Sequence, residues 1–196
     1  MPLTAEDRSE ILMLAGRYSQ SLDLRDPEGW RAVWTDDAVM EMELQQLWIT
    51  GDALWRLASD EHDRPDDRVS RHQPSNFVID GDGDEATMSS YCTVVSAGSR
   101  DNPFGEPARI TFQGRYVDRL RRVDGAWRIA HRKIITDWID SDINDQVKSD
   151  QSASGVSEAT SQIFAATPPS MLIISPVMKR ESSQERKRTR LATSIE

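Results

Sequence analysis

Two residues of this chain have side chains and positions suited to acid–base chemistry, a carboxylate and an imidazole. Asp23 falls at the end of the first predicted helix, and His72 falls at the start of the first long predicted strand. If the sheet closes over that helix, the two side chains can meet. An Asp that accepts the proton of one imidazole nitrogen leaves the other nitrogen free to abstract a proton. In the alternative interpretation, Asp23 caps the helix or pairs with Arg25, and His72 bonds to backbone in a packed wall.

Other kinds of chemistry lack their usual sequence motifs. The chain has no glycine-rich phosphate loop, no CxxC pair, no HExxH and no GxSxG, which are typical of nucleotide hydrolysis, zinc sites and α/β-hydrolases. Residues 60–67, "DEHDRPDD", place His62 among acids that could hold a metal ion, but a polar surface loop explains the same residues. We therefore expect neither a metal nor a cofactor.

Composition limits the class of protein and of partner. The chain has 196 residues, a formal net charge of −9 and a single cysteine, Cys92. An acidic body argues against nucleic acid or an anionic membrane as a partner and favours a small neutral or cationic ligand. One cysteine cannot form an internal disulfide, and no apolar run approaches the ~20 residues of a membrane helix. We expect a soluble cytoplasmic protein.

The first third of the chain predicts helices around a short strand. Thr4 and Asp7 predict a helix start, followed by about 18 residues with apolar side chains at helical spacing. Asp26 and Pro27 then predict a short second helix, with Trp30, Val33 and Trp34 on one side of it. The stretch 38–50 alternates apolar and polar residues as a strand or hairpin does, and Gly51 begins a third helix.

Four long strands follow, and together with the helices they predict the fold. The strands are expected at residues 70–79, 86–97, 108–122 and 126–139, with "DGDGDE" and "VDG" as hairpin turns. Helices followed by a long, mostly antiparallel sheet indicate an α+β fold, a cone in which the N-terminal helices pack in the concave face of a strongly curved sheet. We expect the ligand between sheet and helices.

The domain boundary is expected where the composition changes. Residues 1–142 form the predicted domain, and residues 143–196 form a polar, serine-rich extension that is expected to be flexible. Within it, "MLIISPVM" is expected to dock on the body or on a neighbouring subunit, and "KRESSQERKRTR" is either a solvated end or a contact for an acidic partner.

The pattern of the domain resembles a known family. The order of "YSQSLDLRDPEGWRAVWTDDAV", a Gly-initiated helix, "SRHQPSN" and "GRYVDRLRRVDGAWRIAHRKI" resembles the SnoaL-like branch of the nuclear transport factor 2 superfamily. Within that branch it is most similar to scytalone dehydratase, hexachlorocyclohexane dehydrochlorinase and bile-acid dehydratases. The resemblance implies a cone fold and a cofactor-free Asp/His dyad that abstracts a proton, with Asp23 and His72 as catalytic residues.

The resemblance also implies residues that bind the substrate. The dehydrochlorinase has an arginine in its last strand that assists the departing anion, and its position falls on Arg132. That enzyme's helix-borne lysine and the second histidine of scytalone dehydratase have no counterpart here. Further candidates for the pocket wall, each of which plain core packing would also explain, are Tyr18, Trp34, Tyr91, Phe112 and Tyr116. Asn76, near His72 in the same strand, is a further candidate for binding the substrate.

Strand alternation leaves open which of these residues face inward. In a regular strand His72 shares a face with Asn76, whereas Phe77 takes the other face. The last strand has the same ambiguity, since His131 and Arg132 lie on opposite faces. A β-bulge in either strand would reverse the assignment.

Three functions fit the sequence. The first is a cofactor-free lyase or isomerase, catalysing dehydration, elimination or double-bond migration on a small, largely apolar cyclic substrate. The second is a non-catalytic β-type subunit of a ring-hydroxylating dioxygenase, for which the acid at position 23 would be superfluous. The third is a ligand-binding or adaptor domain of the same fold. Each predicts a homo-oligomer, trimer or dimer, because the long curved sheet leaves one face uncovered.

Overall fold

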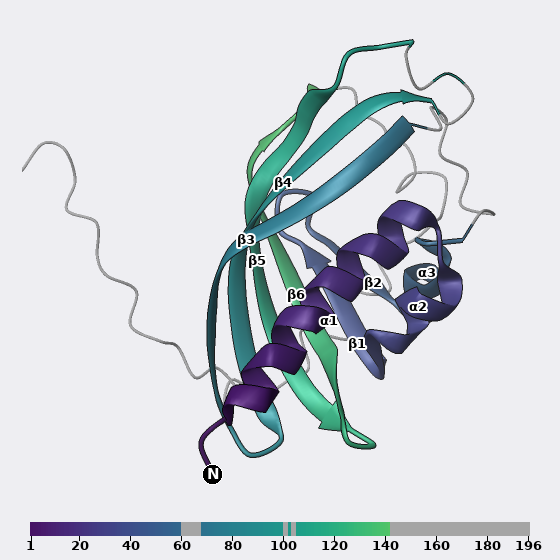
Figure 1. Ribbon diagram of the computed structural model, residues 1–196. Helices are drawn as coiled ribbons and strands as arrows, with labels where there is room; N and C mark the ends of the chain where they lie inside the picture. Colours follow the sequence, from purple (N-terminus) through teal and green to yellow (C-terminus); the bar gives the residue numbers. More distant parts are fainter. Residues whose placement is uncertain (60–67, 100–101, 103–104, 142–196) are drawn as a thin grey trace, which may run out of the picture. The chain divides into compact units, whose positions relative to one another are not determined.

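The computed structural model of the chain describes residues 1–59, 68–99, 102 and 105–141. All of them lie in one unit, which spans Met1–Ser157. The predicted extension 143–196, the His62 loop and most of the loop at 98–107 lie outside the described residues. The helix at the N-terminus, α1, spans Ala5–Leu24 and runs diagonally past the strands (Figure 1).

Local sequence determines both ends of α1. The Thr4 hydroxyl accepts a hydrogen bond from the Asp7 backbone N–H (3.1 Å), and the Asp7 carboxylate accepts one from the Thr4 N–H (2.8 Å). This reciprocal pair is a capping box, and it confirms the predicted start. The helix ends where Arg25 adopts the left-handed conformation, with φ of 55°. The C-terminal turn of α1 therefore ends with Asp23 and Leu24.

Two short helices follow the predicted order, with one shift of boundary. Helix α2 spans Pro27–Ala32, and its N-cap Asp26 accepts a hydrogen bond from the Gly29 N–H (2.9 Å). Helix α3 spans Gly51–Arg56. Trp34, which the sequence placed on the second helix, is instead the first residue of strand β1. The cause is the early end of α2, after only six residues.

Six strands form one curled, unclosed sheet of mixed direction. Their order is β2-β1-β6-β5-β4-β3. All neighbouring pairs are antiparallel except β1 and β6, which are parallel. The α+β cone expected from the sequence is confirmed, and the parallel pair is the added detail. The strands are β1 (Trp34–Met42), β2 (Leu47–Thr50), β3 (Arg68–Asp82), β4 (Glu85–Ser99), β5 (Arg109–Val123) and β6 (Ala126–Ile139).

The core lies between α1 and one face of this sheet. Tyr18 and Ile11 of α1 are buried, and so are Trp30 and Trp34 from the segment that leads into β1. Tyr18 is in contact with both tryptophan rings and with Tyr116 of β5, at centroid distances of 5.0, 5.7 and 5.9 Å. Aromatic side chains thus fill much of the space between helix and sheet. We call the sheet face that packs against α1 the inner face.

A bulge in β3 decides which side chains of that strand reach the inner face. The pairing of β3 with β4 shifts between Ser75 and Val78, and Asn76 has a positive φ of 55°. Because this extra residue reverses the alternation, His72 and Phe77 share the inner face, although they are five positions apart. Asn76 is exposed.

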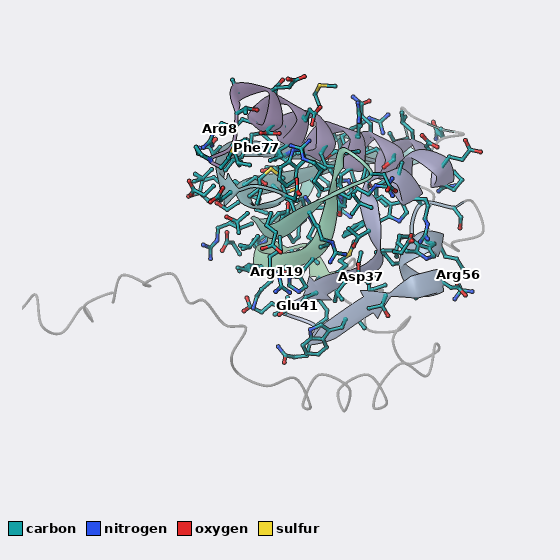
Figure 2. All side chains as sticks on the ribbon, turned by 90° about the horizontal axis from the view of Figure 1, so that it is seen from below. Arg8, Asp37, Glu41, Arg56, Phe77 and Arg119 are labelled. Carbon is teal, nitrogen blue, oxygen red and sulfur yellow. The ribbon has the colours of Figure 1, made fainter. Side chains whose placement is uncertain are left out.

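A second bulge does the same in β6. The pairing with β5 shifts between Arg119 and Leu120, so that Ile129 and Arg132 are both buried on the inner face. His131 therefore lies on the outer face. Figure 2 shows Phe77 on the side of the sheet that carries α1, and Arg119 on the side away from it.

Candidate active site

The end of α1 and the start of β3 bring Asp23 and His72 into contact, as the sequence predicts. One oxygen of the Asp23 carboxylate lies 2.5 Å from Nδ1 of the His72 ring. The other oxygen accepts a hydrogen bond of 2.9 Å from the His72 backbone N–H. The two side chains are 6% and 16% exposed, respectively. A single carboxylate thus holds both the ring and the backbone of one residue, across 49 positions of sequence.

This geometry defines the chemistry that the ring can perform. A carboxylate is an acceptor only, so the hydrogen bond to Nδ1 requires the proton to sit on Nδ1. The lone pair is then on Nε2, on the opposite side of the ring from Asp23. When Nε2 takes a proton, the adjacent carboxylate stabilises the imidazolium. The pair therefore has the geometry that a general base of defined tautomer requires.

Arg132, the predicted anion-stabilising residue, lies on the inner face in a buried ion pair. Its Nε and Nη2 donate to the two oxygens of Asp118 at 2.8 and 2.7 Å. The side chains of Arg132 and Asp118 are 1% and 0% exposed. Burial lowers the pKa of Arg132, but the charge and hydrogen bonds of Asp118 outweigh it and raise that pKa overall. The guanidinium stays charged.

Two tyrosines cover the guanidinium. Its central carbon lies 3.8 Å from the ring centroid of Tyr18 and 4.2 Å from that of Tyr116. Cation–π contacts of this kind are strongest where water is excluded. Burial raises the pKa of both phenols, so both stay protonated. Tyr18 and Tyr116 therefore lie among the inner-face residues, as expected for pocket candidates.

Trp34 and Phe112 also lie on the inner side. Trp34 is fully buried beside Tyr18. Phe112 pairs in register with Val94, which in turn pairs with His72 across β4. Since directly paired residues point to the same face, Phe112 and His72 face the same space from β5 and β3.

Two predicted pocket residues lie elsewhere, and those predictions are corrected. Asn76 is exposed because the β3 bulge turns it away from the inner face. Tyr91 is 55% exposed, since it alternates with Ser90 and Cys92, which are buried on the inner face. Neither Asn76 nor Tyr91 belongs to the group around the dyad.

Sequence reasoning missed three inner-face residues, Asp118, Ser90 and Cys92. Asp118 alternates with Tyr116 and with the buried Leu120. Strand alternation in "GRYVDRL" could therefore have predicted that Asp118 points inward together with Tyr116. Burial raises the pKa of the Cys92 thiol. The charge of Arg132 lowers this pKa and the charge of Asp23 raises it, so both charged groups are near the thiol. Cys92 thus lies between the dyad and the buried ion pair.

Groups of three or more potential metal ligands do not occur among the residues that the structure describes. In the same part of the chain, no helix is long and apolar enough to cross a membrane.

Comparison with known proteins gives a family and several structural relatives. A family model for a SnoaL-like domain matches residues 3–133. No curated protein matches the chain significantly. Among solved structures, Rv3472 of Mycobacterium tuberculosis, a protein of unknown function, is 33% identical, with a TM-score of 0.58 over 69% of this chain and 75% of that one.

Two further structures agree with the fold. A cystatin-like protein of unknown function from Nostoc punctiforme is 31% identical, with a TM-score of 0.56 over 70% of this chain and 96% of that one. A protein from Novosphingobium aromaticivorans, provisionally named a scytalone dehydratase, is 25% identical, with a TM-score of 0.57 over 67% and 85%.

Proposed function

The chain belongs to the SnoaL-like family, and we propose that it is a lyase or isomerase that needs no cofactor, with His72 as its general base. The observation that carries the proposal is the arrangement of Asp23, whose carboxylate binds both the Nδ1 and the backbone N–H of His72. Similarity to a protein provisionally named a scytalone dehydratase supports the same class of reaction.

The proposed reaction begins with removal of a proton from carbon. Nε2 of His72 takes a proton from a carbon beside a carbonyl group or a leaving group, and Asp23 stabilises the imidazolium that forms. The electron pair left on carbon moves toward oxygen or expels the leaving group. Dehydration, elimination and double-bond migration share this first step.

Negative charge that develops on the substrate needs a donor, and Arg132 is the residue that supplies it. Its guanidinium is buried, so a hydrogen bond from it is worth more than one in water. Two of its nitrogens are bound by Asp118, which leaves Nη1 without a partner among the described residues. The substrate is expected to be small and cyclic, because aromatic rings dominate the surroundings.

The dyad also favours this proposal over a dioxygenase β subunit or a binding domain. A scaffold does not need a buried carboxylate that fixes the tautomer of one histidine. Asp23 is 6% exposed and binds both the Nδ1 and the backbone N–H of His72. Burial of a carboxylate costs free energy. In an enzyme, the role of that carboxylate in orienting a base accounts for the cost.

Deuterium exchange tests the proposal without knowledge of the natural substrate. Neutral cyclic ketones such as α-tetralone are incubated in heavy water, and incorporation at the carbon beside the carbonyl is followed by mass spectrometry. We expect the wild-type protein to accelerate exchange and Asp23→Asn to lose that acceleration roughly 100-fold or more. Asn has one acceptor only, and its NH₂ would favour the wrong tautomer of His72.

The matched control is Asp26→Asn, three residues further on. Asp26 is exposed and caps α2, and Asn caps a helix about as well as Asp. This variant should exchange at the wild-type rate. The proposal is wrong if no ketone exchanges faster than in buffer, or if Asp23→Asn retains full activity.

A further inference from the structure

The first half of β3 pairs with β4 one residue out of step with the rest of the hairpin. Val78 lies opposite Ser89, and Arg68 lies opposite Ser99. Both pairs belong to one frame, because the same number of positions separates them on each strand. Residues 69–75, which lie between these pairs, are displaced by one position. We call the first arrangement the regular frame and the second the displaced frame.

Two irregularities accompany the displaced frame. Asn76 is the extra residue on β3 where the displaced frame ends, and Gly98 is the extra residue on β4 where it begins. Each such residue is left unpaired and disrupts the backbone pairing around it. A regular frame throughout would remove both irregularities. Interactions other than backbone pairing must therefore stabilise the displaced frame.

The regular frame would turn His72 away from α1. It would place Gln73, in place of His72, opposite Val94. Arg71 would likewise lie opposite Ser96. Val94 and Ser96 are buried on the inner face, and directly paired residues point to the same face. Gln73 and Arg71 would then face inward, and His72 would face outward.

Burial of apolar side chains does not select the displaced frame. Residues 69–75, "VSRHQPS", contain no fully buried side chain. Their strand, β3, forms one edge of the sheet, and Pro74 has no backbone N–H to contribute to pairing. Register is weakly specified in a strand with polar residues on both faces. Polar contacts of this segment must therefore determine its frame.

Contact with Asp23 is available in both frames. In the displaced frame, the Asp23 carboxylate binds two groups of His72. In the regular frame, Arg71 or Gln73 would face inward instead, and both side chains carry N–H donors that a carboxylate accepts. Arginine in particular forms strong pairs with carboxylates. Asp23 alone therefore does not explain why His72 is the residue that faces inward.

Three hydroxyl groups make a contact that only the displaced frame allows. Ser70 Oγ of β3 lies 3.0 Å from Ser96 Oγ of β4, which lies 3.0 Å from Thr111 Oγ1 of β5. Ser96 and Thr111 are each 3% exposed. In the regular frame Ser70 would face outward, and the buried Ser96 hydroxyl would lose this partner at a cost in free energy. We call Ser70, Ser96 and Thr111 the hydroxyl row.

We propose that the hydroxyl row fixes residues 69–75 in the displaced frame and thereby positions His72 against Asp23. Ser70 lies two positions before His72 on the same face of the strand, so the contact of Ser70 with Ser96 also determines the face of His72. The three hydroxyl residues are positioning residues and do not take part in proton transfer. The consequence for catalysis rests on the proposed function, because it takes His72 as the base.

Nitrogen-15 NMR of the histidine rings tests the frame without any substrate. The chain has three histidines, and the variant His72→Gln identifies the signals of His72. The wild-type protein should give one set of His72 signals, with the proton on Nδ1. Thr111→Val removes a hydroxyl and should add a second set, from a ring that faces solvent, whereas Thr111→Ser keeps the hydroxyl and should give one set. A single, unchanged set in both Thr111→Val and Ser96→Ala overturns the proposal.

A disulfide between β3 and β4 separates a change of frame from a general loss of stability. Ser75 lies opposite Tyr91 in the displaced frame, and both are exposed. Paired residues have Cα atoms about 4.5 to 5.5 Å apart, a distance that a disulfide spans. With Ser75→Cys and Tyr91→Cys added to Thr111→Val, oxidation should restore the single set of His72 signals, and reduction should reverse the effect. Two sets of signals in the oxidised protein overturn the proposal.

Deuterium exchange into α-tetralone measures the consequence for catalysis. Thr111→Val should lower the exchange rate about threefold to tenfold, and Thr111→Ser should keep it. The control is Thr93→Val, which removes a hydroxyl from the outer face of β4 and should change neither the rate nor the His72 signals. If the wild type shows no exchange while the signals behave as expected, catalysis by the dyad is wrong and the role of the hydroxyl row in the frame stands. Two sets of signals without any loss of rate in Thr111→Val overturn the positioning role.

Discussion

Two histidines of this chain contact a carboxylate from opposite faces of the same sheet. On the inner face, Asp23 binds both the ring and the backbone N–H of His72, at 2.5 and 2.9 Å. On the outer face, Nε2 of His131 lies 3.2 Å from Glu41. Glu41 also lies 3.2 Å from Lys133. One carboxylate holds two groups of the same histidine, and the other is shared between a histidine and a lysine.

The difference shows that contact with a carboxylate does not by itself make a histidine a base. Glu41 divides its charge between His131 and Lys133, and Arg119 adds a positive charge nearby. Burial first, and Arg119 second, lower the pKa of His131, against the opposing effect of Glu41. Asp23 instead binds two groups of one residue, Nδ1 and the backbone N–H of His72. This two-point contact on the inner face distinguishes His72.

Replacing each histidine in turn should give the largest contrast. His72→Gln removes the proposed base, so exchange into α-tetralone should fall by about 100-fold to 10,000-fold. His131→Gln should leave the rate within a factor of about two, because His131 lies on the outer face, and surface changes away from a site have small effects. Rates are measured by mass spectrometry at equal concentrations of folded protein. Equal losses of exchange rate in both variants would contradict the claim that only the inner-face histidine acts as a base.

The carboxylates of the two faces should differ in their effect on stability. Asp118→Ala leaves the buried Arg132 without its counter-charge and should lower the free energy of unfolding by about 3–5 kcal/mol. Glu41→Ala removes a partly exposed, shared contact and should cost about 1 kcal/mol or less. Urea denaturation measures both values.

A double substitution serves as the control for Asp118. Asp118→Leu combined with Arg132→Met removes both charges, and apolar replacements of buried pairs are often neutral or stabilising. The double variant should therefore recover most of the loss. A loss below about 1 kcal/mol for Asp118→Ala would mean that the pair adds little to the fold.

The smallest expected effect is on the acid sensitivity of the fold. The pKa of His131 is lowered from its ordinary value of 6.5, so the unfolded chain binds the proton more tightly than the folded protein. The stability contributed by neutral His131 is thus complete above that ordinary value and is lost as the pH falls through the lowered pKa. His131→Gln should lose less stability than the wild type between about pH 7.5 and pH 5. Urea midpoints at the two pH values provide the measurement, and parallel losses would contradict the assignment.

The sequence predicted the parts that depend on local rules. The capping box at Thr4 and Asp7 and the order of helices and strands follow from spacing and turn residues, and the structure agrees. The Asp23–His72 contact was predicted from the expected closure of the sheet over the first helix, and the structure places the two residues together. Their catalytic role stays a prediction, as does the homo-oligomer.

The faces of the strands could not be predicted, because they depend on bulges. Regular alternation separates His72 from Phe77, whereas the structure puts both on the inner face. The bulge lies at Asn76, and "QPSNF" offers no cue that outweighs regular pairing. The expectation for Tyr91 failed for another reason, because an aromatic residue can occupy either face and only burial decides. Side-chain type alone therefore could not predict which face of the sheet Tyr91 occupies.

The bulge in β3 also has a consequence for how such a chain can change by insertion or deletion. Because the bulge adds one residue, loss of a single codon at position 76 would restore regular pairing without shortening the hairpin turn. His72 and Phe77 would then be four positions apart, so regular alternation alone would keep both on the inner face. A strand that lost the bulge but kept all its residues would instead turn His72 to the outer face. The position of the candidate base thus tolerates the loss of one residue at this point, but not regular pairing at the present length.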